Sequence, residues 1–138
     1  MSVQVRRVEY FYTTVEDRPG QAHGLLSRLA RSEVNLLALS LVPIGPSITQ
    51  FTLFPEDTER LARAAERMGL VLTGPHRAIL ITGDDRLGAL VDSHGRLSEA
   101  GINVYAANGV CDGRGGYGYV MHVRPEDFDN AARALGAE

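Results

Sequence analysis

Two short turns carry the residues of this sequence that are best suited to binding chemistry. The first is Asp17-Arg18-Pro19-Gly20, and the second is Asp85-Arg86-Leu87-Gly88. Each turn precedes a stretch with helical spacing of apolar residues, so each places a helix N-terminus, with unpaired N–H groups and a positive dipole end, beside an aspartate. Such a terminus suits a carboxylate, and a glycine without a side chain lets a ligand approach the backbone closely.

The two turns belong to a repeated segment. A shift of 68 residues places residues 17–42 on residues 85–110 without a gap, and eight of these 26 positions are identical, including Asn35 with Asn103. Chance would give roughly two identities. The apolar pattern matches as well. We therefore expect a duplicated unit of about 65 residues, with one domain at 1–74 and a second at 75–138.

The apolar spacing predicts the same order of elements, β-α-β-β-α-β, in both halves. In the first half, strands are predicted at 3–14, 34–42, 48–54 and 70–72, with helices that end near Ser32 and at Gly69. In the second half, strands are predicted at 78–82, 102–110 and 117–123, with helices that end at Gly101 and Gly136. The second hairpin loop is expected to be about two residues longer than the first.

The second half lacks a predicted closing strand, because the chain ends shortly after Gly136. An exposed sheet edge invites pairing, so another strand is expected to cover it. The strand that begins at Val3, from the same chain or from a partner, is the candidate. A unit of about 65 residues buries only some 60% of its unfolded surface, so the halves should pack together or the chain should form a homodimer.

Composition narrows the possible functions. The net charge is −3 and the pI is near 5.8, which argues against nucleic acid or an anionic membrane as a partner. Cys111 is the only cysteine, so neither a disulfide framework nor a thiolate metal site is expected. No apolar signal core and no run of 18 apolar residues is found, so we expect a cytoplasmic protein.

Both halves resemble the ACT domain. The segments Glu16-Asp17-Arg18-Pro19-Gly20 and Val34-Asn35-Leu36 carry the resemblance in the first half, and Asp84-Asp85-Arg86-Leu87-Gly88 and Ile102-Asn103-Val104 carry it in the second. This family is a ferredoxin-like βαββαβ module named for its presence in enzymes of amino-acid biosynthesis. The chain is most similar to free-standing tandem ACT proteins. The implied fold class is α+β, with two ferredoxin-like units, antiparallel sheets and no last strand in the second unit.

The resemblance also implies a site. ACT domains generally bind small effectors, most often amino acids, between two domains. The turn of one unit and the Asn-bearing strand of the facing unit would then share one ligand, and the first turn, which has Pro19, is expected to be the better-formed half-site. The ligand-binding residues implied are Asp17, Arg18, Pro19, Gly20, Gln21, Asn35, Leu36, Asp85, Arg86, Leu87, Gly88, Asn103 and Val104.

Structural roles compete with each of these assignments. The two aspartates could only cap their helices, and the two asparagines could only satisfy loop backbone. The two arginines could face solvent or pair with a local carboxylate. His94 replaces Leu26 on the inner side of its helix and is expected to be a hydrogen-bonded, half-buried histidine, with ligand sensing as the alternative.

Other chemistry is disfavoured. The histidines lack metal-ligand spacing, and Cys111 has no partner histidine near it in sequence. The glycine-rich segment 113–118 joins two strands and lacks the ending of a phosphate loop, so it is expected to be a hairpin tip that could act as a lid. No cofactor is expected.

The sequence thus favours a non-catalytic sensor that binds an amino acid or related metabolite and regulates by changing how its units or subunits pack. One alternative is a regulatory subunit that acts mainly by binding another protein, such as a regulated enzyme. A second alternative is a small ferredoxin-like enzyme that uses His94 or an aspartate pair. RNA binding is weaker still, because the aromatic and basic signature of RNA-binding sheets is absent.

Overall fold

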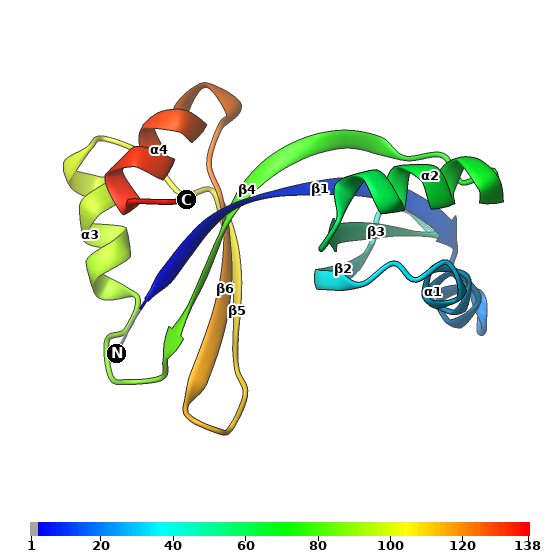
Figure 1. The fold of residues 1–138 in the computed structure, drawn as a ribbon, viewed down its shortest axis with the longest axis horizontal. Coiled ribbons are helices and arrows are strands. Elements are labelled where there is room, and N and C mark those ends of the chain that lie inside the picture. Colours follow the sequence, from blue (N-terminus) through cyan, green and yellow to red (C-terminus); the bar gives the residue numbers. More distant parts are fainter. Residues whose placement is uncertain (1–2) are drawn as a thin grey trace. The chain divides into compact units, whose positions relative to one another are not determined.

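The computed structural model describes residues 3–138. Figure 1 shows the elements in chain order. They are β1 (Gln4–Glu16), α1 (Gln21–Arg31), β2 (Leu36–Pro43), β3 (Ile48–Pro55), α2 (Thr58–Met68), β4 (Thr73–Asp84), α3 (Val91–Glu99), β5 (Ala106–Cys111), β6 (Gly116–His122), the 3-10 turn η1 (Pro125–Asp127) and α4 (Phe128–Leu135).

The chain forms two compact units. The N-terminal unit is Glu9–His76, and the C-terminal unit is Arg77–Glu138 together with the described residues up to Val8. The long strands β1 and β4 therefore contribute residues to both units. The strand order is β2-β3-β1-β4 in the N-terminal unit and β1-β4-β6-β5 in the C-terminal unit. Both orders are ferredoxin-like, so the predicted α+β fold class is confirmed. The observed division differs from the expected 1–74 and 75–138.

The N-terminal segment of the chain itself supplies the strand that the second half lacks. The first residues of β1 lie next to β4 within the C-terminal unit. The end of the chain is tied to the same segment: the N–H of Glu138 donates to the carbonyl of Val5, and the N–H of Arg7 donates to the carbonyl of Glu138, both at 3.1 Å. Of the two sources left open by the sequence, the structure shows the same chain.

Two details of the predicted elements are wrong. No strand forms at 70–72; the strand that closes the N-terminal unit is the first part of β4, which continues without a break into the C-terminal unit. The second hairpin is not longer than the first, because Pro43 pairs with Thr49 and Cys111 pairs with Tyr117 across loops of equal length. The glycines at 116 and 118 belong to β6, although in the sequence they look like loop residues.

The core of the N-terminal unit lies between its helices and one face of its strands. Leu25 and Leu29 of α1 and Leu61 of α2 are fully or almost fully buried, and they pack with Phe51 and Leu53 of β3. The leucines of the two helices are at positions where apolar residues recur at helical spacing in the sequence. Burial of such side chains contributes roughly 1.5–3 kcal/mol each, which holds both helices on the same side of the sheet.

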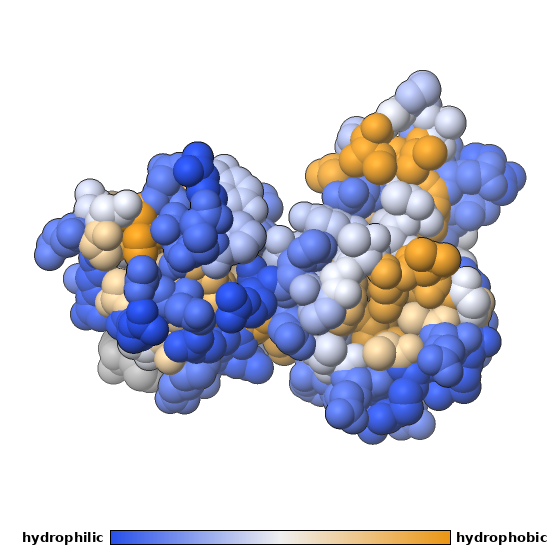
Figure 2. All heavy atoms as spheres, turned by 90° about the horizontal axis from the view of Figure 1, so that it is seen from above, coloured by the Kyte–Doolittle hydropathy of each residue, from blue (hydrophilic) through white to orange (hydrophobic). Residues whose placement is uncertain are grey.

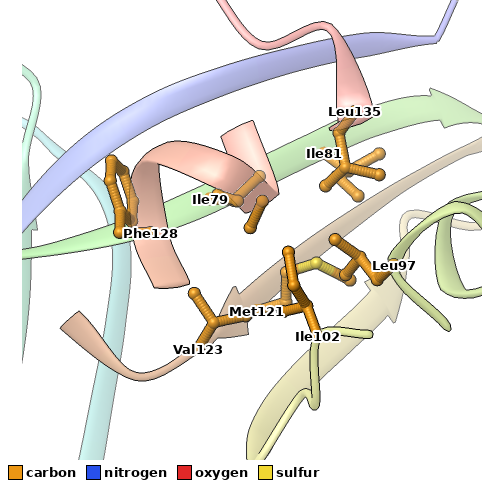
Figure 3. Close-up of a cluster of buried hydrophobic side chains, with 9 residues drawn as sticks. Ile79, Ile81, Leu97, Ile102, Met121, Val123, Phe128 and Leu135 are labelled. Carbon is orange, nitrogen blue, oxygen red and sulfur yellow. The ribbon is translucent and has the colours of Figure 1, made fainter. Parts of the chain in front are cut away.

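The core of the C-terminal unit repeats this arrangement and is shown in Figure 3. Leu97 of α3 and Phe128 of α4 pack with Ile79 and Ile81 of β4 and with Met121 of β6. The sequence spacing of Val91 with His94 and Leu97 predicts Val91 on the inner face of α3, and this is wrong. Val91 is 71% exposed, because it is the first residue of α3 and faces away from this core.

Candidate ligand-binding site

The first turn is a type II turn that precedes α1. The N–H of Gln21 donates to the carbonyl of Arg18 at 3.2 Å, and Gly20 has φ 88° and ψ −14°. These are the values expected at the second central position of a type II turn, which requires a positive φ and therefore favours glycine. The helix starts after this turn and has no side-chain cap. The interpretation of Asp17 as a helix cap is therefore wrong.

The second turn repeats this geometry. The N–H of Ala89 donates to the carbonyl of Arg86 at 3.0 Å, and Gly88 has φ 73°. Leu87 occupies the place of Pro19, and its side chain is fully exposed. Both aspartates are held through their backbone. The N–H of Asp17 donates to the carbonyl of Ser47, and the N–H of Asp85 donates to the carbonyl of Gly115, each at 2.8 Å. The first arginine, Arg18, pairs locally with Glu16 at 3.2 Å, as the alternative interpretation held.

Within each unit the predicted asparagines lie far from the turns. Strands β1 and β2 both pair antiparallel with β3, so they run in the same direction. Asp17 follows the end of β1, whereas Asn35 precedes the start of β2, at the opposite end of the unit. Asn35 is occupied locally, since its Nδ2 donates to Glu56 Oε2 at 3.4 Å and its carbonyl accepts from the N–H of Glu56 at 2.9 Å. Leu36 packs against the core.

A hollow lies beside the second turn within the C-terminal unit. It has a volume of about 450 Å³, which falls in the range of small-molecule sites. The turn and the start of α3 line one side of it, including Asp85, Arg86, Gly88 and Leu90. Strands β5 and β6 line the other side with Gly109, Val110, Cys111, Tyr117 and Tyr119. Three predicted ligand-binding residues, Asp85, Arg86 and Gly88, therefore meet at one hollow.

A histidine and a tyrosine connect this hollow with a second one. His94 Nε2 lies 2.9 Å from Tyr119 Oη, and the two rings are tilted with their centroids 5.7 Å apart. Tyr119 lines the hollow beside the turn, whereas His94 lines a hollow of about 520 Å³ that also contains Asn103 and Val104. The prediction of a hydrogen-bonded, half-buried histidine is confirmed for His94.

The electrostatics of the hollow are set by the turn. The carboxylate of Asp85, by hydrogen bonding and by its negative charge, raises the pKa of the Cys111 thiol above its ordinary value. Burial raises the pKa of Tyr117, and the nearby Arg86 opposes that shift. The hydroxyl of Tyr117 is buried, and no described residue hydrogen-bonds it. The hollow thus combines one negative and one positive side chain at the turn with aromatic rings on the strand β6.

Sequence reasoning missed the strand residues of this site. Gly109, Tyr117 and Tyr119 were not predicted, although the 68-residue shift relates them to Leu41, Thr49 and Phe51 of the first half. A comparison of the two halves at these strand positions would have shown a glycine in place of Leu41 and tyrosines in place of Thr49 and Phe51. Among residues 3–138 no group of three or more histidine, cysteine or acidic side chains is placed to hold a metal ion, and no helix there is long and apolar enough to cross a membrane.

Comparison with known proteins identifies the fold. No family model matches the sequence, and no curated protein matches it. Among solved structures, the chain is similar to the protein BT0572 from Bacteroides thetaiotaomicron, with a TM-score of 0.78, 16% identity, and coverage of 97% of this chain and 88% of that chain. It is also similar to the ligand-free regulatory subunit of aspartate kinase from Thermus thermophilus, with a TM-score of 0.65, 17% identity, and coverage of 99% and 95%.

A third solved structure, of aspartokinase alpha and beta subunits, gives a TM-score of 0.56 at 16% identity, with coverage of 98% of this chain and 95% of that chain. At these identities the similarities show the fold. It is the ACT-like fold of the regulatory subunit of aspartate kinase, and it extends over nearly the whole chain.

Proposed function

We propose that this chain is a non-catalytic regulatory protein that binds an amino acid or a related metabolite at its second turn. The observation that carries the proposal is the hollow where Asp85, Arg86 and the start of α3 meet β5 and β6. The fold shared with the regulatory subunit of aspartate kinase supports a regulatory role.

The charges at the turn match the backbone of an amino acid. The carboxylate of Asp85 would accept hydrogen bonds from the α-ammonium group. The guanidinium of Arg86 and the positive dipole end of α3 would bind the α-carboxylate. Because the two side chains are adjacent in sequence, both ends of a zwitterion can be bound at one place.

The ligand would regulate by altering packing. In this proposal a facing unit in the second subunit of a homodimer contributes Asn35 or Asn103 to the ligand. A ligand held by two units binds one packing arrangement more tightly than another, and this difference in affinity shifts their equilibrium. A regulated enzyme that responds to this shift is the expected protein partner.

A second candidate function is regulation through protein binding alone. Apolar side chains are exposed along β2 and its hairpin, and Figure 2 shows orange patches on the surface of the N-terminal unit. The exposed apolar side chains of this hairpin include Leu41, Val42, Ile44 and Ile48, which are 41–52% exposed. Strand β2 is also an edge strand of the sheet. An apolar edge strand of this kind is suited to pairing with another chain.

Thermal unfolding in the presence of each of the twenty amino acids tests the sensor. A ligand at a hundred times its Kd stabilises the folded state by about 2.7 kcal/mol, which raises Tm by several degrees. Arg86→Ala and Asp85→Asn should abolish this rise, whereas Arg18→Ala and Asp17→Asn in the first turn serve as matched substitutions. Absence of any rise at millimolar concentrations would contradict the sensor. A stoichiometric protein recovered with the chain would then support the second candidate.

A further inference from the structure

The two units can be compared position by position around the hollow. In the N-terminal unit Thr14 pairs with Gln50, and in the C-terminal unit Thr82 pairs with Gly118. Both pairs differ by the same 68 residues, and so do the hairpin pairs at 43 with 49 and 111 with 117. The shift found in the sequence therefore holds for the paired strands that form the hollow.

Small residues replace large ones on the strands of the C-terminal unit. Gly83 stands at the position of Val15, Ala107 at that of Leu39, and Gly109 at that of Leu41. The space left by two of these side chains is taken by aromatic rings. A Cβ atom on Gly109 would lie 2.8 Å from Cδ1 of Tyr119, and one on Gly83 would lie 3.0 Å from Cε1 of Tyr117. Neither tyrosine could keep its position if the first unit's residues were present.

Polar aromatic residues replace apolar ones in the same region. His94 stands at the position of Leu26, and Tyr119 at that of Phe51. In the N-terminal unit Phe51 is fully buried and Leu26 packs against the same core. In the C-terminal unit the corresponding side chains are joined by a hydrogen bond of 2.9 Å and reach two hollows. The pair that is apolar and packed against the core in the first unit is thus polar in the second unit, where it borders two hollows.

We infer that the two units have diverged, so that the C-terminal unit alone accommodates the side chain of the ligand, in the hollow beneath the second turn. The inference rests on the proposed function and specifies its ligand class. Away from the turn the lining is apolar or aromatic, with Leu90, Val110 and Tyr119, while the charged side chains Asp85 and Arg86 belong to the turn. The ligand is therefore an amino acid with a large, uncharged, apolar side chain, because a charged side chain would be desolvated without a partner.

Cys111 provides a direct readout of this hollow. It is the only cysteine in the chain, it lines the hollow, and it is exposed. The experiment measures the rate at which a small alkylating reagent modifies Cys111 in the intact protein, with millimolar L-leucine, L-phenylalanine, L-lysine or L-aspartate. L-leucine or L-phenylalanine should slow modification several-fold, whereas L-lysine and L-aspartate should leave the rate unchanged.

A glycine pair sharpens the test. Gly109→Ala adds a methyl group against the Tyr119 ring and should abolish protection by the apolar amino acid. Gly24→Ala is the matched control, because a Cβ there meets no atom within 4 Å and lies in α1 of the other unit. If Gly109→Ala does not fold, protection of wild-type Cys111 still decides the question.

The outcomes separate the two proposals. Stabilisation by an apolar amino acid with an unchanged rate at Cys111 would overturn this inference and leave the sensor intact. Protection of Cys111 by L-lysine or L-aspartate would overturn the ligand class. Neither stabilisation nor protection by any amino acid would overturn both.

Discussion

His94 of α3 and Tyr119 of β6 are joined by a hydrogen bond of 2.9 Å between Nε2 and Oη. It replaces the apolar packing of Leu26 and Phe51 in the N-terminal unit. At this one position α3 makes a polar contact with its sheet, whereas the equivalent contact of α1 is apolar; elsewhere α3 packs through the buried Leu97. Because a hydrogen bond needs both partners, substitutions of His94 and of Tyr119 should not have additive effects on the free energy of unfolding.

Tyr119→Phe should lower the free energy of unfolding by about 1 kcal/mol, because it removes the hydroxyl that His94 contacts. The double substitution His94→Leu with Tyr119→Phe should recover part of this loss, since it installs the pair already found in the N-terminal unit. Urea unfolding of the wild type, both single variants and the double variant gives the coupling energy. Strictly additive losses would show that the hydrogen bond contributes nothing.

Asp85→Asn should make Cys111 more reactive at neutral pH. The Asp85 carboxylate raises the pKa of the thiol, so the wild type holds less of the reactive thiolate. Removing the charge lowers that pKa and increases the rate of alkylation. The rate is measured as a function of pH with iodoacetamide, and Asp17→Asn is the control, since the first turn has no cysteine beside it. An equal rate in both variants would contradict the assignment.

The stability of the protein should fall as the pH drops below about 6.5 through the contribution of His122. Burial lowers the pKa of His122 from its ordinary value of 6.5. Below pH 6.5 the unfolded chain therefore binds more protons than the folded chain, so acid favours unfolding. Thermal unfolding across this pH range measures the effect, and His122→Gln should remove this component. A pH dependence that is identical in the variant would exclude His122 as its source.

The fold was predictable because the pattern of apolar residues within each single helix or strand indicates which of its residues face the core. Helical spacing of Leu25 and Leu29 and alternation in β1 place these residues on the core whatever the rest of the chain does. The hollow was not predictable in this way, because it depends on which residues face one another across paired strands. The contact between Tyr119 and Gly109 follows from the register of β5 with β6, which the hydrophobic pattern of either strand alone does not show.

The same distinction explains the error at the first turn and the separation of the asparagines from the turns within each unit. Asp17 before an apolar helical stretch has the pattern of a helix cap, but the type II turn at Pro19 and Gly20 delays the start of α1. The asparagines follow the turns at a constant distance in sequence. The strand directions nevertheless place Asn35 beside Glu56, at the far end of its unit.

Two glycines of the first turn and helix should respond oppositely to alanine. Gly20 has φ 88°, a conformation that alanine adopts only with strain, so Gly20→Ala should destabilise the protein by about 1 kcal/mol or more. Gly24 lies inside α1 with open space at its Cβ position, so Gly24→Ala should stabilise it by about 0.5–1 kcal/mol. Urea unfolding of both variants provides the comparison. Equal effects of the same sign would contradict the turn geometry.

The paired asparagines test whether a facing unit completes the ligand site. Asn35→Ala combined with Asn103→Ala should abolish stabilisation by the amino acid, because the ligand would lose the acceptors supplied from the facing unit. Asn35 is exposed and makes only a long hydrogen bond of 3.4 Å through its side chain, so the fold should survive the substitution. Circular dichroism verifies the fold, and calorimetry measures binding. Asn108→Ala, an exposed asparagine on β5, is the matched control. Undiminished binding in the double variant would confine the site to the C-terminal hollow and exclude a shared ligand.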